Sequence, residues 1–480
     1  GHMAEVSLGE PLLACIEGPS GIGKTRLADE VMVLARSRDL RCFHSRCYER
    51  EQIPYKAVDG LVDQAVGMVL ATPRASQRLR SIAPHRLKAL ARLFPFAAEL
   101  PVASGGEEGE GRIGKQAAFA GLVDLLDVLS DDAGLLLFID DLQWADDGSF
   151  EILRHLLRQR DLRVGLVATL RPAEGALPGW VMERRAGSPL RIEHVPLGPI
   201  DRAETETLVQ AILPRHAVPP EIVDKIAAEA QGSPLVIGEL VRFYLEYAGN
   251  EGGRDELPPM TFSEMLARRM TALGRTARAV MEVCAAAGYA LDPGAIAAAT
   301  RAPVHEVSVA ATELLDRRML RRVAGKEGAM RFCPFNDRAT AIVLERMEPS
   351  QRRDHHRRLA TYFGTTSPTS YEVLADHWRL AGVPERASRY ALRAAENAEE
   401  LELMPRAVRY YALALGAPPP DVDAWQIRMR LAEALDRCGR FTEAGRAFRR
   451  AARHAPARIQ TTLTLRGARA MLKSGDIQTA

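Results

Sequence analysis

The feature of this sequence that most constrains its fold is the run Gly18–Thr25, which reads Gly-Pro-Ser-Gly-Ile-Gly-Lys-Thr. It matches the pattern G-x-x-x-x-G-K-[ST], follows the apolar run Leu12–Ile16 and precedes a helix expected to begin near Arg26. In this context glycines let successive backbone N–H groups face a chain of phosphates, and the helix N-terminus adds a partial positive charge. A chance glycine-rich turn is the alternative, but such a turn requires neither the strand before it nor the helix after it.

The loop therefore predicts contacts to a nucleotide. The Lys24 ammonium is expected to lie against the β- and γ-phosphates, and the Thr25 hydroxyl to bind Mg²⁺. The expected ligands are ATP or ADP with Mg²⁺. The predicted nucleotide-binding residues of the loop are Gly18, Ser20, Gly21, Ile22, Gly23, Lys24, Thr25 and Arg26.

Short apolar runs alternate with helical stretches through the first 200 residues. This rhythm is typical of a parallel sheet with helices on both faces, so we predict an α/β P-loop NTPase domain. A glycine- and glutamate-rich cluster at Ser104–Gly111 interrupts the rhythm and indicates a surface loop. The predicted strands are Leu12–Glu17, Arg41–Cys47, Leu135–Asp140, Val164–Thr169 and Ile192–Leu197.

Two carboxylates and an arginine follow neighbouring predicted strands. Asp140 and Asp141 end the run Leu135–Asp141, at the strand end where an open parallel sheet places its ligands. We predict that Asp140 joins Thr25 in binding the metal and that Asp141 orients the attacking water. Arg171 follows the next strand and would place a cation beside the γ-phosphate, although a surface arginine fits the spacing nearly as well. The predicted catalytic residues are Lys24, Asp141 and Arg171.

From about Asp201 the predicted strands stop. Helical apolar spacing marks Ala203–Leu213, Glu221–Ala230 and Leu235–Tyr247, which we interpret as a small all-α lid domain. The stretch Asn250–Pro259, rich in Gly, Pro and charge, is a predicted linker.

Beyond the linker, helices end in a predicted strand pair, Met319–Val323 and Ala329–Cys333, an order typical of a winged helix. After Tyr371 the chain is helical, and the similar segments Gly439–Ala444 and Gly475–Ala480 stand about 36 residues apart, close to the period of a tetratricopeptide repeat. We predict tetratricopeptide-like (TPR-like) helical repeats, with an irregular helical bundle as the alternative. The predicted divisions are a cloning scar at 1–3, the P-loop domain at 4–200, the lid at 201–255, the winged helix at 256–365 and truncated repeats at 366–480.

The composition excludes several classes of protein. The 64 basic and 62 acidic residues nearly cancel, so the net charge gives no sign of a nucleic acid or membrane partner. No apolar run approaches the roughly 20 residues that cross a bilayer. The six cysteines are scattered without CxxC spacing, which indicates reduced thiols in the cytoplasm. The ends of the sequence suggest a piece of a larger protein.

Several segments together resemble one class of ATPases. Asp140–Asp146 (Asp-Asp-Leu-Gln-Trp-Ala-Asp), Arg171 after its strand, and Gly232–Leu235 (Gly-Ser-Pro-Leu) ahead of a helix are similar to the STAND class of signal-transduction ATPases, which includes the maltose-type activators and the large LuxR-type regulators. A closer resemblance is to the ATPase and tetratricopeptide region of large bacterial serine/threonine protein kinases, and it rests on the segments Cys47–Lys56 and Leu90–Pro95.

The resemblance implies Lys24, Thr25, Asp140, Asp141 and Arg171 in the family's roles. It adds Pro234 against the adenine, a signal bound by the repeats, self-association in the ATP state and an effector domain upstream. Many members carry a histidine in the winged helix that touches the ADP phosphates, but Phe332–Arg338 contains none. Asn336 and Arg338 are the alternatives in that stretch. The family's Gly-Arg-Glu segment before the first strand is also missing.

These features favour a slowly hydrolysing switch that couples nucleotide state and ligand sensing to self-assembly and control of an attached effector, expected to be a kinase. A DNA-binding regulator of LuxR type, using Arg317–Arg318 and Arg321–Arg322 of the winged helix, is the main alternative. A substrate-remodelling motor is a third. The pair His355–His356 lies in the charged run Arg352–Arg358 and is interpreted as part of a solvated helix face.

Overall fold

The structure is a computed structural model that describes residues 12–48, 55–101, 115–130, 134–159, 162–171, 177–182, 190–212, 220–250, 261–324 and 330–474. The chain forms two compact units: one spans Gly1–Arg278 and Pro334–Glu345, and the other spans Ala279–Cys333 and Arg346–Ala480. The predicted loop at 104–111, most of the predicted linker at 250–259 and the segment 475–480 lie outside the described residues.

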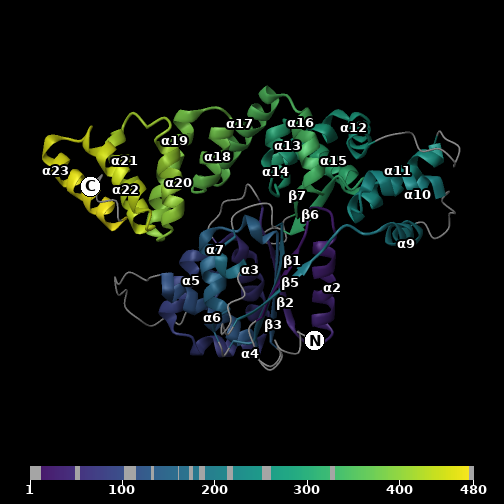
Figure 1. Ribbon diagram of the computed structural model, residues 1–480, viewed down its shortest axis with the longest axis horizontal. Coiled ribbons are helices and arrows are strands. Elements are labelled where there is room, and N and C mark those ends of the chain that lie inside the picture. Colours follow the sequence, from purple (N-terminus) through teal and green to yellow (C-terminus); the bar gives the residue numbers. More distant parts are fainter. Residues whose placement is uncertain are drawn as a thin grey trace. The chain divides into compact units, whose positions relative to one another are not determined.

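A five-stranded sheet forms the centre of the first unit (Figure 1). The strand order is β2-β3-β4-β1-β5, and every neighbouring pair is parallel. All residues of β3 and β4 are buried, which explains their continuous apolar runs. The predicted parallel sheet is confirmed, and each predicted strand ends within one residue of its observed bounds. The strands are β1 (Leu12–Glu17), β2 (Arg41–Arg46), β3 (Leu135–Asp140), β4 (Val164–Leu170) and β5 (Arg191–Pro196).

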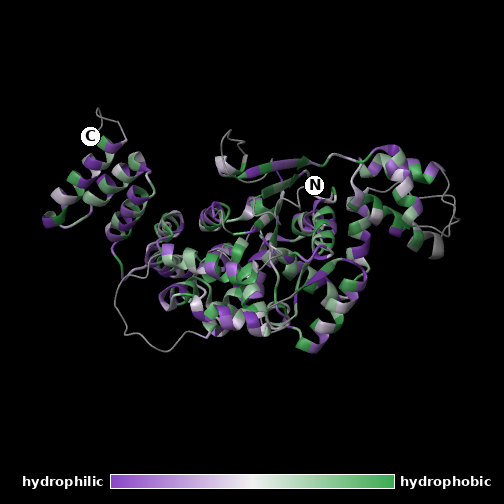
Figure 2. Ribbon diagram, turned by 90° about the horizontal axis from the view of Figure 1, so that it is seen from below, coloured by the Kyte–Doolittle hydropathy of each residue, from purple (hydrophilic) through white to green (hydrophobic). Residues whose placement is uncertain are grey.

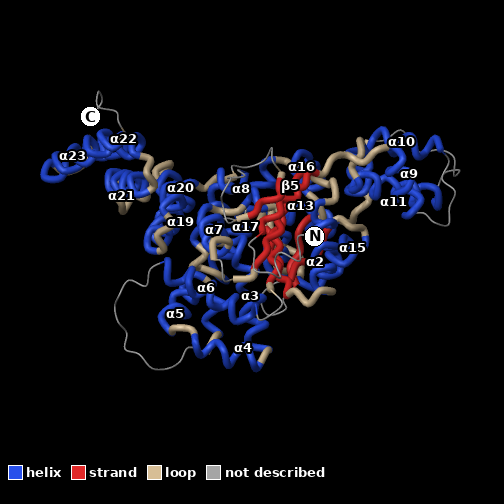
Figure 3. Tube along the Cα trace, turned by 60° about the horizontal axis from the view of Figure 1, so that its bottom comes forward, coloured by secondary structure: helices blue, strands red, loops and turns tan. Residues whose placement is uncertain are grey.

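Helices lie on both sides of this sheet, α2 on one side and α3, α6 and α7 on the other (Figures 1 and 3). Ala28, Met32 and Ala35 line one face of α2 at helical spacing and pack in one cluster with Leu136 and Phe138 of β3. The helices of this region are α2 (Lys24–Arg36), α3 (Lys56–Ala71), α4 (Pro73–Arg78), η1 (Leu79–Ser81), α5 (Pro84–Leu93), η2 (Pro95–Glu99), α6 (Lys115–Ser130), η3 (Leu142–Trp144), α7 (Asp147–Leu156) and α8 (Gly179–Met182).

Beyond the sheet and the helices that cover it, the described residues of the first unit form further helices, of which those between 202 and 250 fall in the predicted lid. Thr261 caps α12 through a reciprocal capping box with Glu264, which fixes where that helix begins. The helices are α9 (Arg202–Ile212), α10 (Pro220–Ala230), α11 (Pro234–Asn250) and α12 (Phe262–Thr271). Most of α16 (Asp337–Arg346) belongs to this unit as well.

The second unit contains the helices and strand pair expected of a winged helix, followed by helical hairpins. Its first part comprises most of α13 (Arg275–Ala287) and of β7 (Met330–Pro334), together with α14 (Pro293–Thr300), α15 (Val304–Asp316), β6 (Leu320–Ala324) and α17 (Pro349–Thr366). The strands β6 and β7 form a two-stranded sheet, and Leu291 pairs with Phe332 in an antiparallel bridge.

The predicted helical repeats are confirmed in the C-terminal part of this unit, where each helix packs on the next. Gly382, in the turn between α18 and α19, has a left-handed φ angle of 74°, and Gly439, in the turn between α21 and α22, has one of 76°. This backbone conformation favours glycine. Ala444, Phe448 and Ala451 form part of the buried face of α22. The helices are α18 (Tyr371–Leu380), α19 (Pro384–Glu400), α20 (Met404–Ala414), α21 (Ala424–Arg437), α22 (Phe441–Ala452) and α23 (Ala457–Lys473).

The helices carry hydrophilic and hydrophobic residues side by side along their length (Figure 2). Among the helices of the described ranges, none is both long and apolar enough to span a membrane.

The interpretation of His355 and His356 as a solvated face is wrong. Their exposed fractions are 5% and 0%. Nδ1 of His356 lies 3.0 Å from Nδ1 of the buried His377, and Nε2 of His377 lies 2.7 Å from the Tyr289 hydroxyl. Helix α17 therefore turns His356 toward His377 of α18 and His355 toward Glu282 of α13, and leaves its charged neighbours to cover the rest of its surface.

Candidate nucleotide-binding site

The loop Gly18–Gly23 connects β1 to α2, as the motif predicts. Gly23 immediately precedes α2 and has a φ of 104°, a backbone angle that residues other than glycine rarely adopt. A Cβ at Gly23 would meet no atom within 4 Å, so the backbone angle alone explains this glycine. Lys24 is buried, and its Nζ donates hydrogen bonds of 2.8 Å to the carbonyl oxygens of Gly18 and Pro19. The ammonium is thereby held inside the curve of the loop.

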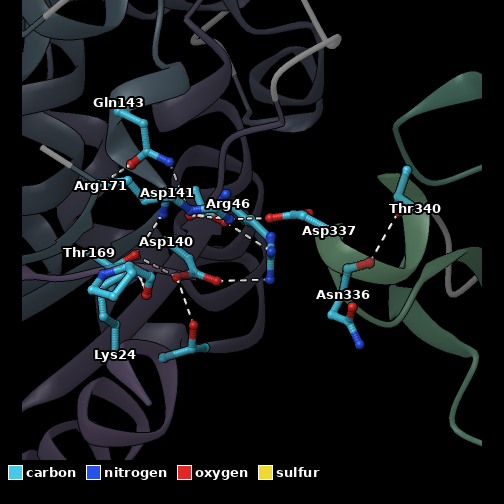
Figure 4. Close-up of polar contacts among 12 residues, drawn as sticks. Lys24, Arg46, Asp140, Asp141, Gln143, Thr169, Arg171, Asn336, Asp337 and Thr340 are labelled. Carbon is cyan, nitrogen blue, oxygen red and sulfur yellow. Dashed lines mark hydrogen bonds and ion pairs between the residues drawn. The ribbon is translucent and has the colours of Figure 1, made fainter. Parts of the chain in front are cut away.

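The carboxylate of Asp140 lies at the end of β3, against the start of α2. Its Oδ1 accepts hydrogen bonds from the hydroxyls of Thr25, at 3.0 Å, and Thr169, at 2.6 Å (Figure 4). The side chains of Thr25 and Asp140, predicted from positions 115 residues apart, thus meet. Together they offer the hydroxyl and carboxylate oxygens that Mg²⁺ prefers.

Asp141 lies next to Asp140 in an unusual backbone conformation. Its φ of 58° is left-handed, and its N–H donates a 2.7 Å hydrogen bond to the hydroxyl of Thr169. Thr169, on the adjacent strand β4, therefore contacts both acidic residues. Strain at a non-glycine residue is often stored where function requires a fixed side chain. Thr169 was not singled out from the sequence, because a threonine within an apolar strand carries no motif.

Arg171 lies beside Asp141, with its Nη2 3.2 Å from Oδ1 of that carboxylate. Gln143 fixes both residues: its Nε2 donates to Oδ1 of Asp141 at 3.1 Å, and its Oε1 accepts from the backbone N–H of Arg171 at 3.2 Å. Only 9% of Arg171 is exposed, so the alternative of a surface arginine does not hold. The guanidinium of Arg171 is therefore held at the carboxyl end of the sheet.

A second arginine at this edge escaped the sequence prediction. Arg46, the last residue of β2, places Nη1 2.9 Å from Oδ2 of Asp140 and Nη2 2.9 Å from Oδ2 of Asp141. Its side chain bridges the two carboxylates (Figure 4). Burial alone would lower the pKa of Arg46, but the two carboxylates raise it above its usual range. The guanidinium therefore remains charged.

The charge state of Asp141 reflects its crowded surroundings. Burial, followed by the charge of Asp140, raises the pKa of the Asp141 carboxyl. Arg46 and Arg171 lower it without cancelling the rise. A carboxylate whose proton affinity is increased in this way is a stronger hydrogen-bond acceptor for a water molecule, the role predicted for Asp141.

The predicted winged-helix region contributes Asp337 to the site. Asp337 is the first residue of α16, and its Oδ2 pairs with Nη2 of Arg171 (Figure 4). Asn336 instead accepts a 2.7 Å hydrogen bond from the N–H of Ala339, and the guanidinium of Arg338 stacks 4.8 Å above the ring of Phe262. The stretch 332–338 therefore reaches the site through an acidic residue, which neither of the two alternatives considered from the sequence anticipated.

The turn Gly232–Leu235 contacts the loop from another direction. The Ser233 hydroxyl donates to the carbonyl oxygen of Gly21 at 3.3 Å, and the N–H of Leu235 donates to the same oxygen at 3.2 Å. Pro234, the predicted adenine contact, begins α11 between these two residues. Among the other predicted residues, Ile22 is buried, whereas the exposed Arg26 side chain pairs with Glu30 on its own helix.

The residues present fit Mg²⁺ and a nucleotide. The loop has the left-handed glycine and the inward-facing lysine that a phosphate cradle needs, and Thr25 and Asp140 supply adjacent oxygen donors. Lys24, Thr25, Asp140, Asp141 and Arg171 gather at one edge of the sheet, as predicted.

One family model and one curated protein match this chain. Residues 1–170 match the model of the AAA ATPase domain family. An uncharacterized protein of Rhizobium meliloti (strain 1021) is 24% identical over 463 residues, which are 92% of this chain and 42% of that protein. The chain thus spans less than half the length of this curated relative. The family match supports the predicted P-loop ATPase domain at residues 1–170.

Solved structures were also found to be similar. A Signal Transduction ATPase with Numerous Domains that has a tetratricopeptide repeat sensor, from Pyrococcus horikoshii, has a TM-score of 0.49 and 13% identity, covering 100% of this chain and 67% of its own. Drosophila ORC bound to DNA has a TM-score of 0.28 and 14% identity, covering 69% of this chain and 88% of its own.

Proposed function

We propose that this chain, whose residues 1–170 match the AAA ATPase domain family, is a signalling switch of the STAND class that binds ATP with Mg²⁺ and hydrolyses it slowly. One observation carries the proposal. Arg171, at the edge of the sheet where the γ-phosphate would lie, is shared between Asp141 of the ATPase domain and Asp337 of α16. A nucleotide phosphate that binds Arg171 would replace Asp337 as its partner and so remove this contact between α16 and the ATPase domain.

Each residue has a proposed task in ATP binding and hydrolysis. Lys24 contacts the β- and γ-phosphates, and Thr25 and Asp140 hold Mg²⁺, which neutralises phosphate charge when bound. Asp141 accepts a hydrogen bond from the attacking water and orients it. Arg171 stabilises the charge that develops on the γ-phosphate. Because all these groups are pre-positioned by β3, β4 and α2, the protein supplies positioning and electrostatics more than covalent chemistry.

The turn Gly232–Leu235 of the predicted lid would close a second side of the nucleotide site. Ser233 and Leu235 already touch the loop at Gly21, so the intervening Pro234 is well placed to cover a bound base, and we propose that it lies against the adenine. Opening of the lid would break both contacts to Gly21. The domain divisions predicted above and a cytoplasmic location are part of this proposal.

The helical repeats are the proposed sensor of a small-molecule or protein signal. A pocket there is lined by Trp378, Glu385, Arg386, Arg389, Tyr390, Pro418 and Pro420. The guanidinium of Arg386 lies 4.6 Å above the ring of Trp378. Signal binding and ATP together would favour self-association, and the controlled effector would be a separate domain of the protein, with a serine/threonine kinase as our proposal.

Nucleotide binding is tested by Lys24→Ala, with the exposed Lys225→Ala on α10 as the matched control. At a hundredfold excess over Kd a ligand stabilises the native state by about 2.7 kcal/mol. Mg-ATP should therefore raise the melting temperature of wild type and Lys225→Ala, and leave Lys24→Ala unchanged. Equal shifts in all three proteins would show that the nucleotide binds elsewhere.

The switch itself is tested on Asp141→Asn, which should bind ATP without consuming it. Small-angle X-ray scattering with saturating ADP or Mg-ATP measures whether the nucleotide selects between two shapes, since a ligand shifts such an equilibrium only by its differential affinity. We expect a larger radius of gyration with Mg-ATP. Identical profiles, with unchanged mass by light scattering, would leave a nucleotide-binding module that does not switch.

A further inference from the structure

Arg46 is the residue whose position the ATPase chemistry leaves unexplained. The pairing of β2 with β3 aligns Arg46 with Asp140, and the N–H of Cys47 continues the ladder to the Asp140 carbonyl at 2.9 Å. The backbone therefore fixes the guanidinium at the carboxyl edge of the sheet. Only 25% of its side chain is exposed, and the carboxylates that it bridges are 6% and 8% exposed.

The hydrogen bonds of Asp140 show what Arg46 does to the predicted metal site. Oδ1 of Asp140 already accepts from Thr25 and Thr169, and Oδ2 contacts Nη1 of Arg46 at 2.9 Å. Both oxygens of the predicted metal ligand are therefore engaged by the protein itself. Mg²⁺ demands near-ideal octahedral geometry and loses its bound water reluctantly, so a guanidinium on the same carboxylate oxygen hinders its approach.

Charge adds to this steric conflict. A guanidinium stays protonated at all accessible pH values, so Arg46 cannot yield its place by losing a proton. A divalent cation at Oδ2 of Asp140 would lie within a few ångströms of that fixed charge, in a site that excludes most solvent. Arg46 can move away without leaving the site, because Asp141 offers it a second carboxylate at 2.9 Å.

We propose that Arg46 is a positioning residue that competes with the divalent cation for Asp140 and so sets the Mg²⁺ concentration at which nucleotide is bound. This inference rests on the proposed nucleotide site and deepens it. When the cation engages Asp140, Arg46 retains only its contact to Asp141. A purely structural counter-ion would stabilise the fold equally but would leave the metal dependence unchanged.

The experiment titrates MgCl₂ at fixed, subsaturating concentration of a fluorescent ADP analogue and measures nucleotide binding to wild type, Arg46→Met and Arg41→Met. Arg41 begins the same strand, opposite Leu135 instead of Asp140, and donates to the backbone carbonyl of Leu129, so Arg41→Met is a matched loss of an arginine at the other end of the strand. For Arg46→Met we expect the Mg²⁺ midpoint to fall on the order of tenfold, equivalent to about 1.4 kcal/mol. Arg41→Met should keep the wild-type midpoint.

A second readout needs no nucleotide. In EDTA, Arg46→Met should melt below wild type because each of two buried carboxylates loses a cationic partner, and MgCl₂ alone should restore more stability to the variant than to wild type. Arg46→Lys, whose ammonium keeps the charge but lacks the guanidinium's two-armed geometry, should give an intermediate midpoint, and it replaces Arg46→Met if that variant fails to fold.

The outcomes separate this inference from the function on which it rests. If wild type binds no nucleotide at any Mg²⁺ concentration, the proposed function fails. If wild type binds but the Arg46→Met midpoint is unchanged, or rises, Arg46 does not compete with the metal and the inference is overturned. An equal fall in Arg41→Met would also overturn it, because the effect would then not depend on the bridged carboxylates.

Discussion

The contact between Arg171 and Asp337 predicts how the chain distinguishes ATP from ADP. The informative change is Asp337→Asn, which keeps the shape of the side chain and removes its charge. Two unit charges about 4 Å apart attract by about 4 kcal/mol at an effective dielectric constant of about 20. The Asp337 side chain is 54% exposed, so solvent reduces this to about 1 kcal/mol, the upper range for exposed pairs. Arg171 keeps its second partner, Asp141, at 3.2 Å, and in an Asp141→Asn background its N–H still donates to Gln143 at 3.2 Å, so the fold should tolerate the change.

Only ATP has a γ-phosphate to compete with Asp337 for Arg171. Removal of about 1 kcal/mol of competition should therefore strengthen ATP binding about fivefold and leave ADP binding nearly unchanged. Isothermal titration calorimetry on the hydrolysis-deficient Asp141→Asn background measures both affinities. Because that background also removes one charge beside Arg171, the comparison is between Asp141→Asn with and without Asp337→Asn.

Asp224→Asn is the control, since Asp224 is 48% exposed and pairs with Arg202 at 2.6 Å in the lid region. It matches Asp337→Asn in exposure and in lost charge, and we expect the ratio of ATP to ADP affinity to stay at its starting value. An unchanged ratio in Asp337→Asn as well would refute the idea that Asp337 and the γ-phosphate compete. A fivefold gain for both nucleotides would instead point to general relief of negative charge.

Three further outcomes follow from named contacts. Asp141→Asn should retain Mg-ATP binding and lose at least tenfold in single-turnover hydrolysis, because an amide accepts a hydrogen bond from water more weakly than a carboxylate does. Gly445→Ala should cost about 1–3 kcal/mol in urea unfolding, since its Cβ would lie 2.7 Å from Cγ of Met471. Burial lowers the pKa of His377 to about 3, below the unfolded value of about 6.5, so its contribution to stability is complete above pH 6.5 and declines as the pH falls toward 3. Because only wild type loses this contribution, its free energy of unfolding should fall by up to about 2 kcal/mol relative to that of His377→Gln between pH 6.5 and 5. A difference between the two proteins that does not change with pH would contradict the lowered pKa of His377.

The strands and the loop were predictable because their signals are local. Leu135–Asp140 and Val164–Leu170 are continuous apolar runs whose residues are all buried, and the run Gly18–Thr25 carries its own geometry in its glycines. Since strand ends at one edge of a parallel sheet converge, the meeting of Thr25 with Asp140 also followed from the sequence.

Arg46 and Asp337 were not predictable because their roles depend on distant pairing. Arg46 ends a strand of mixed polarity, and only the register of β2 with β3, whose sequences are nearly 100 residues apart, aligns it with Asp140. Asp337 reaches Arg171 because α16 returns to the first unit after an excursion through the second. The buried His356 follows the same logic, since a charged stretch conceals its inward face until the partner helix that carries His377 is known.

The five residues Asp140, Arg46, Asp141, Arg171 and Asp337 form a row of alternating charges, each in contact with the next. The predicted metal ligand stands at one end and the residue from α16 at the other. Under the two proposals above, Mg²⁺ on Asp140 leaves Arg46 paired with Asp141 alone. This closer pairing weakens the ion pair between Asp141 and Arg171. A γ-phosphate can then attract Arg171 away from Asp337. Metal and γ-phosphate thus act on opposite ends of one row, and binding of either favours binding of the other, because linkage between sites is reciprocal. ADP lacks the γ-phosphate and metal-free ATP leaves Arg46 on Asp140, so only Mg-ATP is expected to free Asp337 efficiently.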